Sequence, residues 1–153
     1  MNHNKAIKDR GDGCAFGIKG SRDGLPLIGT FNENVRHFSE KQKLPWLVSV
    51  SSHFSDMFPS KLPRETEFPS LGQWEDSLIA TIEGASQFVW VGHVTWNGFR
   101  EVFFHIDEPE RVSRSLGKLT SGAHIRSFTF EIDFDEDWER VGVYFKEKTR
   151  PTN

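Results

Sequence analysis

The sequence predicts a single α+β domain in which two helices cover one face of an antiparallel sheet. Three observations lead to this expectation: a hairpin signal centred on Asn97-Gly98, two segments with helical periodicity, and alternating apolar strands on either side of them. The 153 residues suffice for one buried core, and 36% hydrophobic with 27% charged residues is typical of a globular protein rather than a disordered or membrane protein.

The hairpin signal is the strongest local feature of the chain. Residues 88–96 and 99–107 are rich in β-branched and aromatic side chains, and Asn97-Gly98 suits a type I′ turn, which needs positive φ at both central positions. Counting from that turn, Trp90 is expected to face His105. One face of the sheet would then carry a mixed set of side chains: Trp90, Trp96, Phe99, Glu101, Phe103 and His105.

A helix is predicted on each side of the hairpin. Ser70 and Gln73 match a capping box at the start of the first helix, and Gly84 is placed to end it. The second helix is expected to begin near Asp107-Glu108-Pro109 and to end at Gly122. The first helix carries one apolar stripe, made of Leu71, Trp74, Leu78, Ile79 and Ile82.

Strands are predicted before the first helix and after the second, over Trp46–Phe54 and Ile125–Phe134, with a further short strand over Val141–Phe145. Residues 46–134 then read strand, helix, strand, strand, helix, strand. That is the element order of a ferredoxin-like sandwich, which has two helices on one face of an antiparallel sheet.

The N-terminal part predicts a β-hairpin extension. Cys14–Lys19 and Leu25–Phe31 read as strands around a loop rich in turn-forming residues, and residues 1–13 read as a flexible lead-in. Residues 32–43 form a polar connection with room for a short helical piece. Residues 55–69 contain three prolines and no periodicity. A loop of this length inside a compact domain is usually functional or mobile, but a solvated connecting loop is the favoured interpretation here.

Composition and charge exclude several classes of protein. Cys14 is the only cysteine, so an internal disulfide or a cysteine-based zinc site cannot form. A net charge of −3 argues against nucleic acid as a direct ligand. No apolar run approaches the ~20 residues that span a bilayer. The polar N-terminus lacks the apolar stretch of a signal peptide, so a cytoplasmic location is expected.

No motif in the chain indicates catalysis or a cofactor. The glycines lack the spacing of a phosphate-binding loop, and no serine sits in a nucleophile elbow. The six histidines show no metal-ligand spacing, and His93 and His105 are expected on opposite faces of the hairpin. We therefore expect polar strand or core roles for the histidines, no cofactor and no metal.

The segment Glu131–Glu139 stands out by charge, because six carboxylates fall within nine residues together with Phe134 and Trp138. One interpretation is a solvated strand end and loop. The other is an acidic and aromatic surface that docks on a basic partner. The aromatic sheet face leaves three alternatives open: an interaction surface, a homodimer contact, or a core covered by the N-terminal hairpin.

The hairpin carries a family resemblance. The stretch Val91–Phe104 resembles the family catalogued as domain of unknown function 695, whose members show a similar valine-glycine, threonine, glycine, arginine-glutamate and aromatic pattern. Trp74-Glu75-Asp76 and Asp137-Trp138 fall where that family tends to have comparable residues. The same hairpin pattern is similar to the regulator of ribonuclease E activity B, which implies a ferredoxin-like fold and inhibition of a ribonuclease by binding.

These observations favour a non-enzymatic protein that binds and occludes a partner enzyme, such as an immunity protein against a bacterial toxin or a ribonuclease regulator. The partner would be another protein, for example a basic nuclease or toxin. The expected partner-binding residues are Trp90, Trp96, Phe99, Phe103, Asp135, Glu136, Asp137 and Trp138. The alternative is a small-ligand-binding protein or enzyme with a pocket near the proline-rich loop, and with Arg100, Glu101 and His105 close to it. Arg100 and Glu101 are neighbours on a strand and must face opposite ways, which ranks this alternative second.

Overall fold

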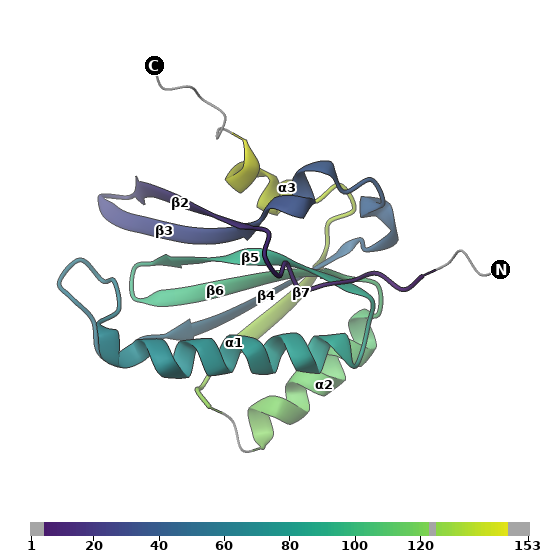
Figure 1. The fold of residues 1–153 in the computed structure, drawn as a ribbon. Helices are drawn as coiled ribbons and strands as arrows, with labels where there is room; N and C mark the ends of the chain where they lie inside the picture. The colour runs from purple at the N-terminus through teal and green to yellow at the C-terminus, as the bar shows by residue number, and fades with distance from the viewer. Residues whose placement is uncertain (1–4, 123–124, 147–153) are drawn as a thin grey trace.

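A computed structural model describes residues 5–122 and 125–146 of the chain. These residues form an α+β fold built on a seven-stranded sheet, which confirms the predicted class (Figure 1). The strands are β1 (Lys8–Asp9), β2 (Ala15–Arg22), β3 (Leu25–Asn32), β4 (Trp46–His53), β5 (Phe88–Trp96), β6 (Phe99–Ile106) and β7 (Thr129–Phe134). The α-helices are α1 (Phe68–Glu83), α2 (Pro109–Ser121) and α3 (Glu139–Gly142). Four 3-10 helices complete the described elements: η1 (Glu33–His37), η2 (Lys41–Lys43), η3 (Glu65–Glu67) and η4 (Val143–Phe145).

The strand order is β2-β3-β5-β6-β4-β7, and each of these neighbouring pairs is antiparallel. The short β1 pairs with β5 in parallel. The β2–β3 hairpin therefore extends the sheet beyond β5, rather than folding over one of its faces. Figure 1 shows α1 and α2 on one side of the sheet and α3 on the other.

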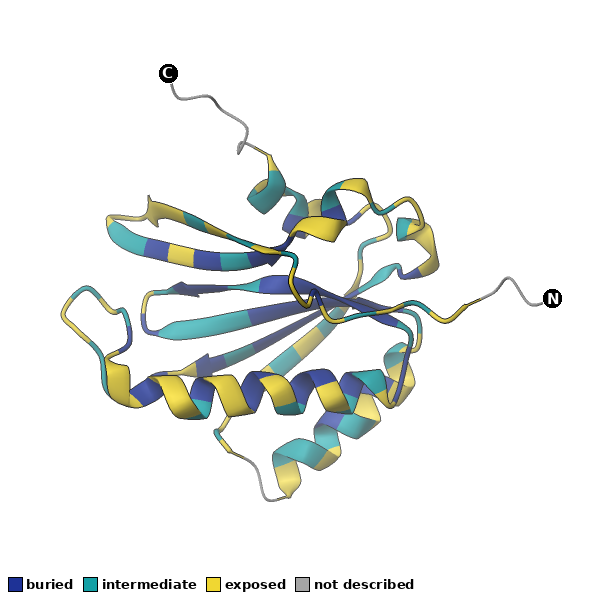
Figure 2. Ribbon diagram, viewed as in Figure 1, coloured by how far each residue is buried: buried dark blue, intermediate teal, exposed yellow. Residues whose placement is uncertain are grey.

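The face under α1 and α2 holds the larger apolar core. The predicted stripe of α1 is buried, and Figure 2 shows buried and exposed residues alternating along this helix. The helix begins at Phe68 rather than at Ser70, and the predicted capping box is absent. The Ser70 hydroxyl instead donates to the carbonyl of Glu67, the residue that precedes the helix.

The opposite face of the sheet is also covered. Segments 33–44 and 138–145 pack on it and bury Leu44, Leu47 and Trp138. The predicted strand over residues 141–145 is wrong, because α3 and η4 occupy that stretch. The physical reason lies upstream: the Asp135 carboxylate accepts the backbone N–H groups of Glu139 and Arg140, which favours a helical turn.

A β-bulge in β5 changes the expected register. Trp96 pairs with Phe99 and Gly92 with Phe103 as predicted, but the register then shifts between Trp90 and Gly92. Trp90 therefore pairs with Phe104 rather than with His105. Because a one-residue shift moves side chains to the other face, Trp90 points into the core under α1. The predicted placement of Trp90 on the aromatic face is wrong for this reason.

The N-terminal segment, expected as a frayed lead-in, contacts the sheet from β1 onward. Lys8 and Asp9 pair with the start of β5, and Gly11 is buried against Trp90. Residues 1–4 lie outside the described residues. Among the described helices, none is long and apolar enough to cross a membrane.

Candidate functional site

A row of polar side chains crosses the sheet beneath the N-terminal half of α1. Glu67 and Glu75 approach from the helix side and are only 7% and 8% exposed. Burying such groups costs free energy unless they are paired, and perturbed ionisable groups concentrate at functional sites. We call the row the polar belt; its members are Ser52, Glu67, Glu75, His93, Arg100 and Arg126.

One end of the polar belt opens into a cleft of about 390 Å³, which we call the α1 cleft. Its walls are the N-terminal loop, α1, the start of β2 and strands β3, β5 and β6. The lining residues are Arg10, Gly11, Asp12, Gly13, Ala15, Thr30, Gly72, Glu75, Asp76, Ile79, Trp90, His93 and Arg100.

Glu75 organises the α1 cleft. Its carboxylate accepts a hydrogen bond from Trp90 Nε1 at 2.8 Å, and His93 Nδ1 lies 2.9 Å from the same group. The nearest guanidinium nitrogen of Arg100 is 3.7 Å away. Burial alone would raise the pKa of Glu75, but the His93 hydrogen bond, the charge that His93 carries when it is protonated, the charge of Arg100 and the Trp90 hydrogen bond outweigh burial and lower it. Glu75 is therefore ionised at neutral pH.

An ionised Glu75 determines which nitrogen of His93 carries the proton. A carboxylate can only accept, so neutral His93 is assigned a proton on Nδ1, and Nε2 is left as an acceptor. His93 Nε2 makes no hydrogen bond to the described residues. Three buried side-chain atoms of the described residues have no hydrogen-bond partner, namely Ser49 Oγ, Trp74 Nε1 and His105 Nε2, and His93 Nε2 is not one of them. His93 lines the α1 cleft, and its side chain is 15% exposed.

Arg100 also reaches the α1 cleft with unused donors. Its Nε donates to Thr95 Oγ1 at 3.1 Å. Its two terminal nitrogens make no hydrogen bond to the described residues, and neither is among the fully buried atoms that lack a partner. Burial lowers the pKa of Arg100, against the opposing charge of Glu75. A guanidinium still remains charged at neutral pH, so Arg100 offers a charged donor pair.

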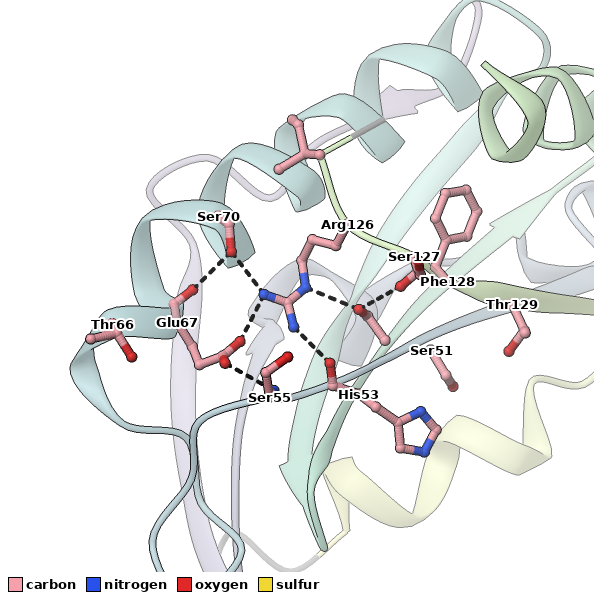
Figure 3. Close-up of a pocket in the computed structure, with 12 residues that line it drawn as sticks. Ser51, His53, Ser55, Thr66, Glu67, Ser70, Arg126, Ser127, Phe128 and Thr129 are labelled. Carbon is pink, nitrogen blue, oxygen red and sulfur yellow. Dashed lines mark hydrogen bonds and ion pairs between the residues drawn. The ribbon is translucent and has the colours of Figure 1, made fainter. Parts of the chain in front are cut away.

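Arg126 gives a contrast at the other end of the polar belt, where a second pocket of about 500 Å³ opens (Figure 3). Its guanidinium donates to Glu67, Ser70, Ser52 Oγ and the backbone carbonyl of His53, all within 2.8–2.9 Å. Figure 3 shows Glu67, Ser70 and His53 around the guanidinium. Arg126 thus ties the segment before β7 to β4 and α1, which is a structural role.

Glu67 is the anionic partner in that pocket. Burial would raise its pKa, but the backbone N–H of Asp56, the Arg126 side chain and the backbone N–H of Ser55 lower it. The remaining lining is rich in hydroxyl groups, contributed by Ser51, Ser52, Ser55, Thr66, Ser70, Ser127 and Thr129. Because the guanidinium nitrogens of Arg126 already donate hydrogen bonds to groups of the protein, the α1 cleft is the stronger candidate site.

The family model described as "Family of unknown function (DUF695)" matches residues 19–146. The chain belongs to this family. The DUF695 match contains Glu75, His93 and Arg100. No curated protein and no solved structure matches the chain, so the similarity to the regulator of ribonuclease E activity B is not shown by these comparisons.

In this DUF695 chain, the aromatic residues predicted to bind a partner are largely inside the protein. Trp90 and Phe103 are each 6% exposed, and Trp138 is 2% exposed. Trp138 stacks on His105 with ring centroids 4.0 Å apart and donates from Nε1 to the carbonyls of Lys41 and Leu44. These three aromatics therefore support the core.

The other predicted partner-binding residues lie in two places. Trp96 and Phe99 flank the hairpin turn and are half-buried, with Trp96 Nε1 donating to the Arg22 carbonyl. Glu136 and Asp137 are exposed in the turn after β7, while Asp135 holds the start of α3. The acidic and the aromatic residues do not form one continuous exposed surface.

The residues expected near a ligand pocket in the alternative function, Arg100, Glu101 and His105, are also separated in the structure. Arg100 lines the α1 cleft, but Glu101 lies on the opposite face, where burial raises its pKa. His105 is fully buried under Trp138. The three residues therefore share no site. Among the described residues, no group of three His, Cys, Asp or Glu side chains is placed to hold a metal ion.

Glu75 and His93 are the functional candidates that sequence reasoning missed, although a signal for each exists. Glu75 lies four residues after Leu71 and three before Leu78, which puts a carboxylate within the apolar stripe of α1. His93 pairs with Val102, two residues from Arg100 on the facing strand, so the two polar side chains share a face.

Proposed function

We propose that this DUF695 protein binds a small ligand through an oxyanion, a carboxylate or phosphate group, in the α1 cleft. The observation that supports the proposal best is the state of Arg100: a largely buried guanidinium whose terminal nitrogens have no hydrogen-bond partner among the described residues. Paired N–H donors of arginine match carboxylate and phosphate geometry. The cleft volume also falls in the range of small-molecule sites.

The charges around Arg100 support the same proposal. Glu75 is the nearest carboxylate, yet it is 3.7 Å away and also engages His93 and Trp90. The positive charge of Arg100 is therefore only partly compensated inside the protein. An oxyanion in the cleft would supply the missing acceptors, while Ile79 and Trp90 provide apolar wall for the rest of the ligand.

Replacing Arg100 by Gln is expected to weaken oxyanion binding at least about tenfold, since a charged hydrogen bond contributes roughly 1.5–3 kcal/mol. The measurement is a titration with sodium acetate and with sodium phosphate, followed through the NMR signals of Arg100 Nε–H and of the α1 cleft. The matched control is Arg140→Gln, which removes an exposed arginine paired with Asp133. Equal affinity of the wild-type protein and Arg100→Gln, or shifts confined to other surfaces, would contradict the proposal.

A second candidate function is binding of a basic protein partner, as an immunity protein or a ribonuclease regulator would do in the cytoplasm. It is supported by the exposed Glu136 and Asp137, which follow the edge strand β7, and by Phe134, which is 59% exposed beside them. Opposite charges steer association and favour particular partners.

The double substitution Glu136→Lys and Asp137→Lys is expected to abolish capture of such a partner while leaving the thermal unfolding midpoint close to that of the wild-type protein. Asp135 is kept because its carboxylate accepts two N–H groups of α3. The measurement is a quantitative pull-down from the native lysate. A stoichiometric basic protein that co-elutes equally with both forms would exclude this surface as its binding site.

We also propose that residues 46–134 form a ferredoxin-like core, with the β2–β3 hairpin as an extension. The contiguous strand order β5-β6-β4-β7 and the placement of both long helices on one face support this class.

A further inference from the structure

We propose that the α1 cleft hydrolyses a small acyl ester, with His93 Nε2 as the proton acceptor for a water molecule and Arg100 as the donor to the developing oxyanion. This inference rests on the proposed function, because the carboxylate product of such a reaction is the oxyanion that Arg100 is proposed to bind. It adds a reaction and a substrate class to that binding site.

The geometry around Glu75 supports a base at His93. An imidazole acts as a base through a nitrogen that carries no proton, and it does so best when a carboxylate fixes its other nitrogen. Glu75 meets this requirement from α1, and the Trp90 indole holds the Glu75 carboxylate in place. Glu75 is thus a positioning residue that acts through His93.

The second hairpin histidine shows why His93 is the relevant one. His105 also has an Nε2 without a hydrogen-bond partner among the described residues, but that atom is buried and the ring is stacked on Trp138. His93 Nε2 has no described partner either, yet it belongs to a side chain that lines a cleft. A ligand can reach only the latter.

Arg100 completes the arrangement next to the base. His93 Nδ1 and the nearest Arg100 nitrogen lie 2.9 Å and 3.7 Å from the same Glu75 carboxylate, so the two side chains are immediate neighbours. Donors aimed at a position where negative charge develops are among the strongest contributors to acyl-transfer catalysis.

The reaction consumes one water molecule and balances without a further reactant. His93 Nε2 takes a proton from water as the water oxygen bonds to the acyl carbon, and Arg100 donates to the resulting oxyanion. The carbon–oxygen bond to the leaving alcohol then breaks, and the proton on His93 passes to that alcohol. The products are a carboxylic acid, ionised at neutral pH, and an alcohol.

The test uses the full chain with p-nitrophenyl acetate as the probe ester. Wild-type protein is expected to release p-nitrophenolate at least about tenfold faster than His93→Gln, because a positioned base contributes roughly 10²–10⁴-fold in evolved sites. The control His37→Gln removes an exposed histidine of η1 and should retain the wild-type rate. A rate that is unchanged in His93→Gln would overturn the proposal.

A second measurement separates the positioning role of Glu75 from a structural one. Long-range ¹H–¹⁵N spectra of the wild-type protein should show neutral His93 protonated on Nδ1, and Glu75→Gln should shift His93 toward the other tautomer and lower the rate. A wild-type His93 protonated on Nε2 would overturn the proposal even if Glu75→Gln does not fold.

The two proposals fail in different ways. Acetate binding at Arg100 together with a rate independent of His93 would remove the hydrolysis and leave the proposed function. A rate that depends on His93, without acetate or phosphate binding at Arg100, would support the base and contradict the oxyanion site.

Discussion

Replacing Gly92 by Ala is expected to lower the free energy of unfolding by about 4 kcal/mol, from roughly 1–3 kcal/mol of backbone strain and a similar cost of overpacking. Gly92 lies in the β5 bulge with φ of +152°, which side-chain-bearing residues rarely adopt. A Cβ atom there would lie 2.2 Å from a ring carbon of Phe31 and 2.6 Å from the Thr30 carbonyl oxygen.

Neither neighbour can move away cheaply. Phe31 is fully buried and stacks on Tyr144 with centroids 4.6 Å apart, and the Thr30 carbonyl belongs to the backbone of β3. The measurement is chemical denaturation against Gly117→Ala, a glycine inside α2 with no contact within 4 Å of an added Cβ. The control should gain up to ~1 kcal/mol from helix propensity. An unfolding midpoint of Gly92→Ala equal to that of the wild-type protein would contradict the bulge.

Acidification is expected to destabilise the fold through His105. Burial lowers the pKa of His105 to about 4, despite the opposing hydrogen bond to the Leu44 carbonyl. The unfolded chain has the ordinary histidine pKa near ~6.5. The folded state therefore resists protonation, and the free energy of unfolding falls as the pH drops from about 6.5 to about 4, by about 3 kcal/mol in total.

The variant His105→Phe isolates this contribution. A phenyl ring can still stack on Trp138, and the Leu44 carbonyl keeps its hydrogen bond from Trp138 Nε1. Free energies of unfolding are measured for both proteins between pH 4 and 7, and their difference is taken so that the buried carboxylates common to both cancel. The difference should change by about 3 kcal/mol over that range. If the free energies of unfolding of the wild-type protein and of His105→Phe changed with pH in the same way, His105 would not resist protonation in the folded state.

Local chemistry explains which parts of the fold could be predicted. The Asn97-Gly98 turn depends on two residues that tolerate positive φ, and both have it, at 53° and 89°. The start of α2 depends on a proline in the first turn, and Pro109 is there. The bulge at Val91 could not be predicted from the turn, because it exists where Phe31 of the neighbouring strand packs on Gly92.

The candidate site was only partly predictable for a related reason. Arg100 could be singled out as a polar residue on an apolar strand. The contact of Glu75 with His93, however, joins a helix to a strand and needs the register and the helix position together. The covering of the sheet face opposite α1 and α2 likewise depends on segments that are far apart in the sequence. There the Trp138 indole N–H donates to the carbonyls of Lys41 and Leu44.

The N-terminal wall of the α1 cleft has a practical consequence for how family members are compared. Arg10, Gly11 and Asp12 line the cleft, yet the family match begins at residue 19. Boundaries drawn from that match cut through the α1 cleft and leave Glu75, His93 and Arg100 without one side of their enclosure. A ligand screen or a comparison of relatives trimmed to those boundaries would assess an incomplete cavity, so the segment upstream of β2 belongs in both.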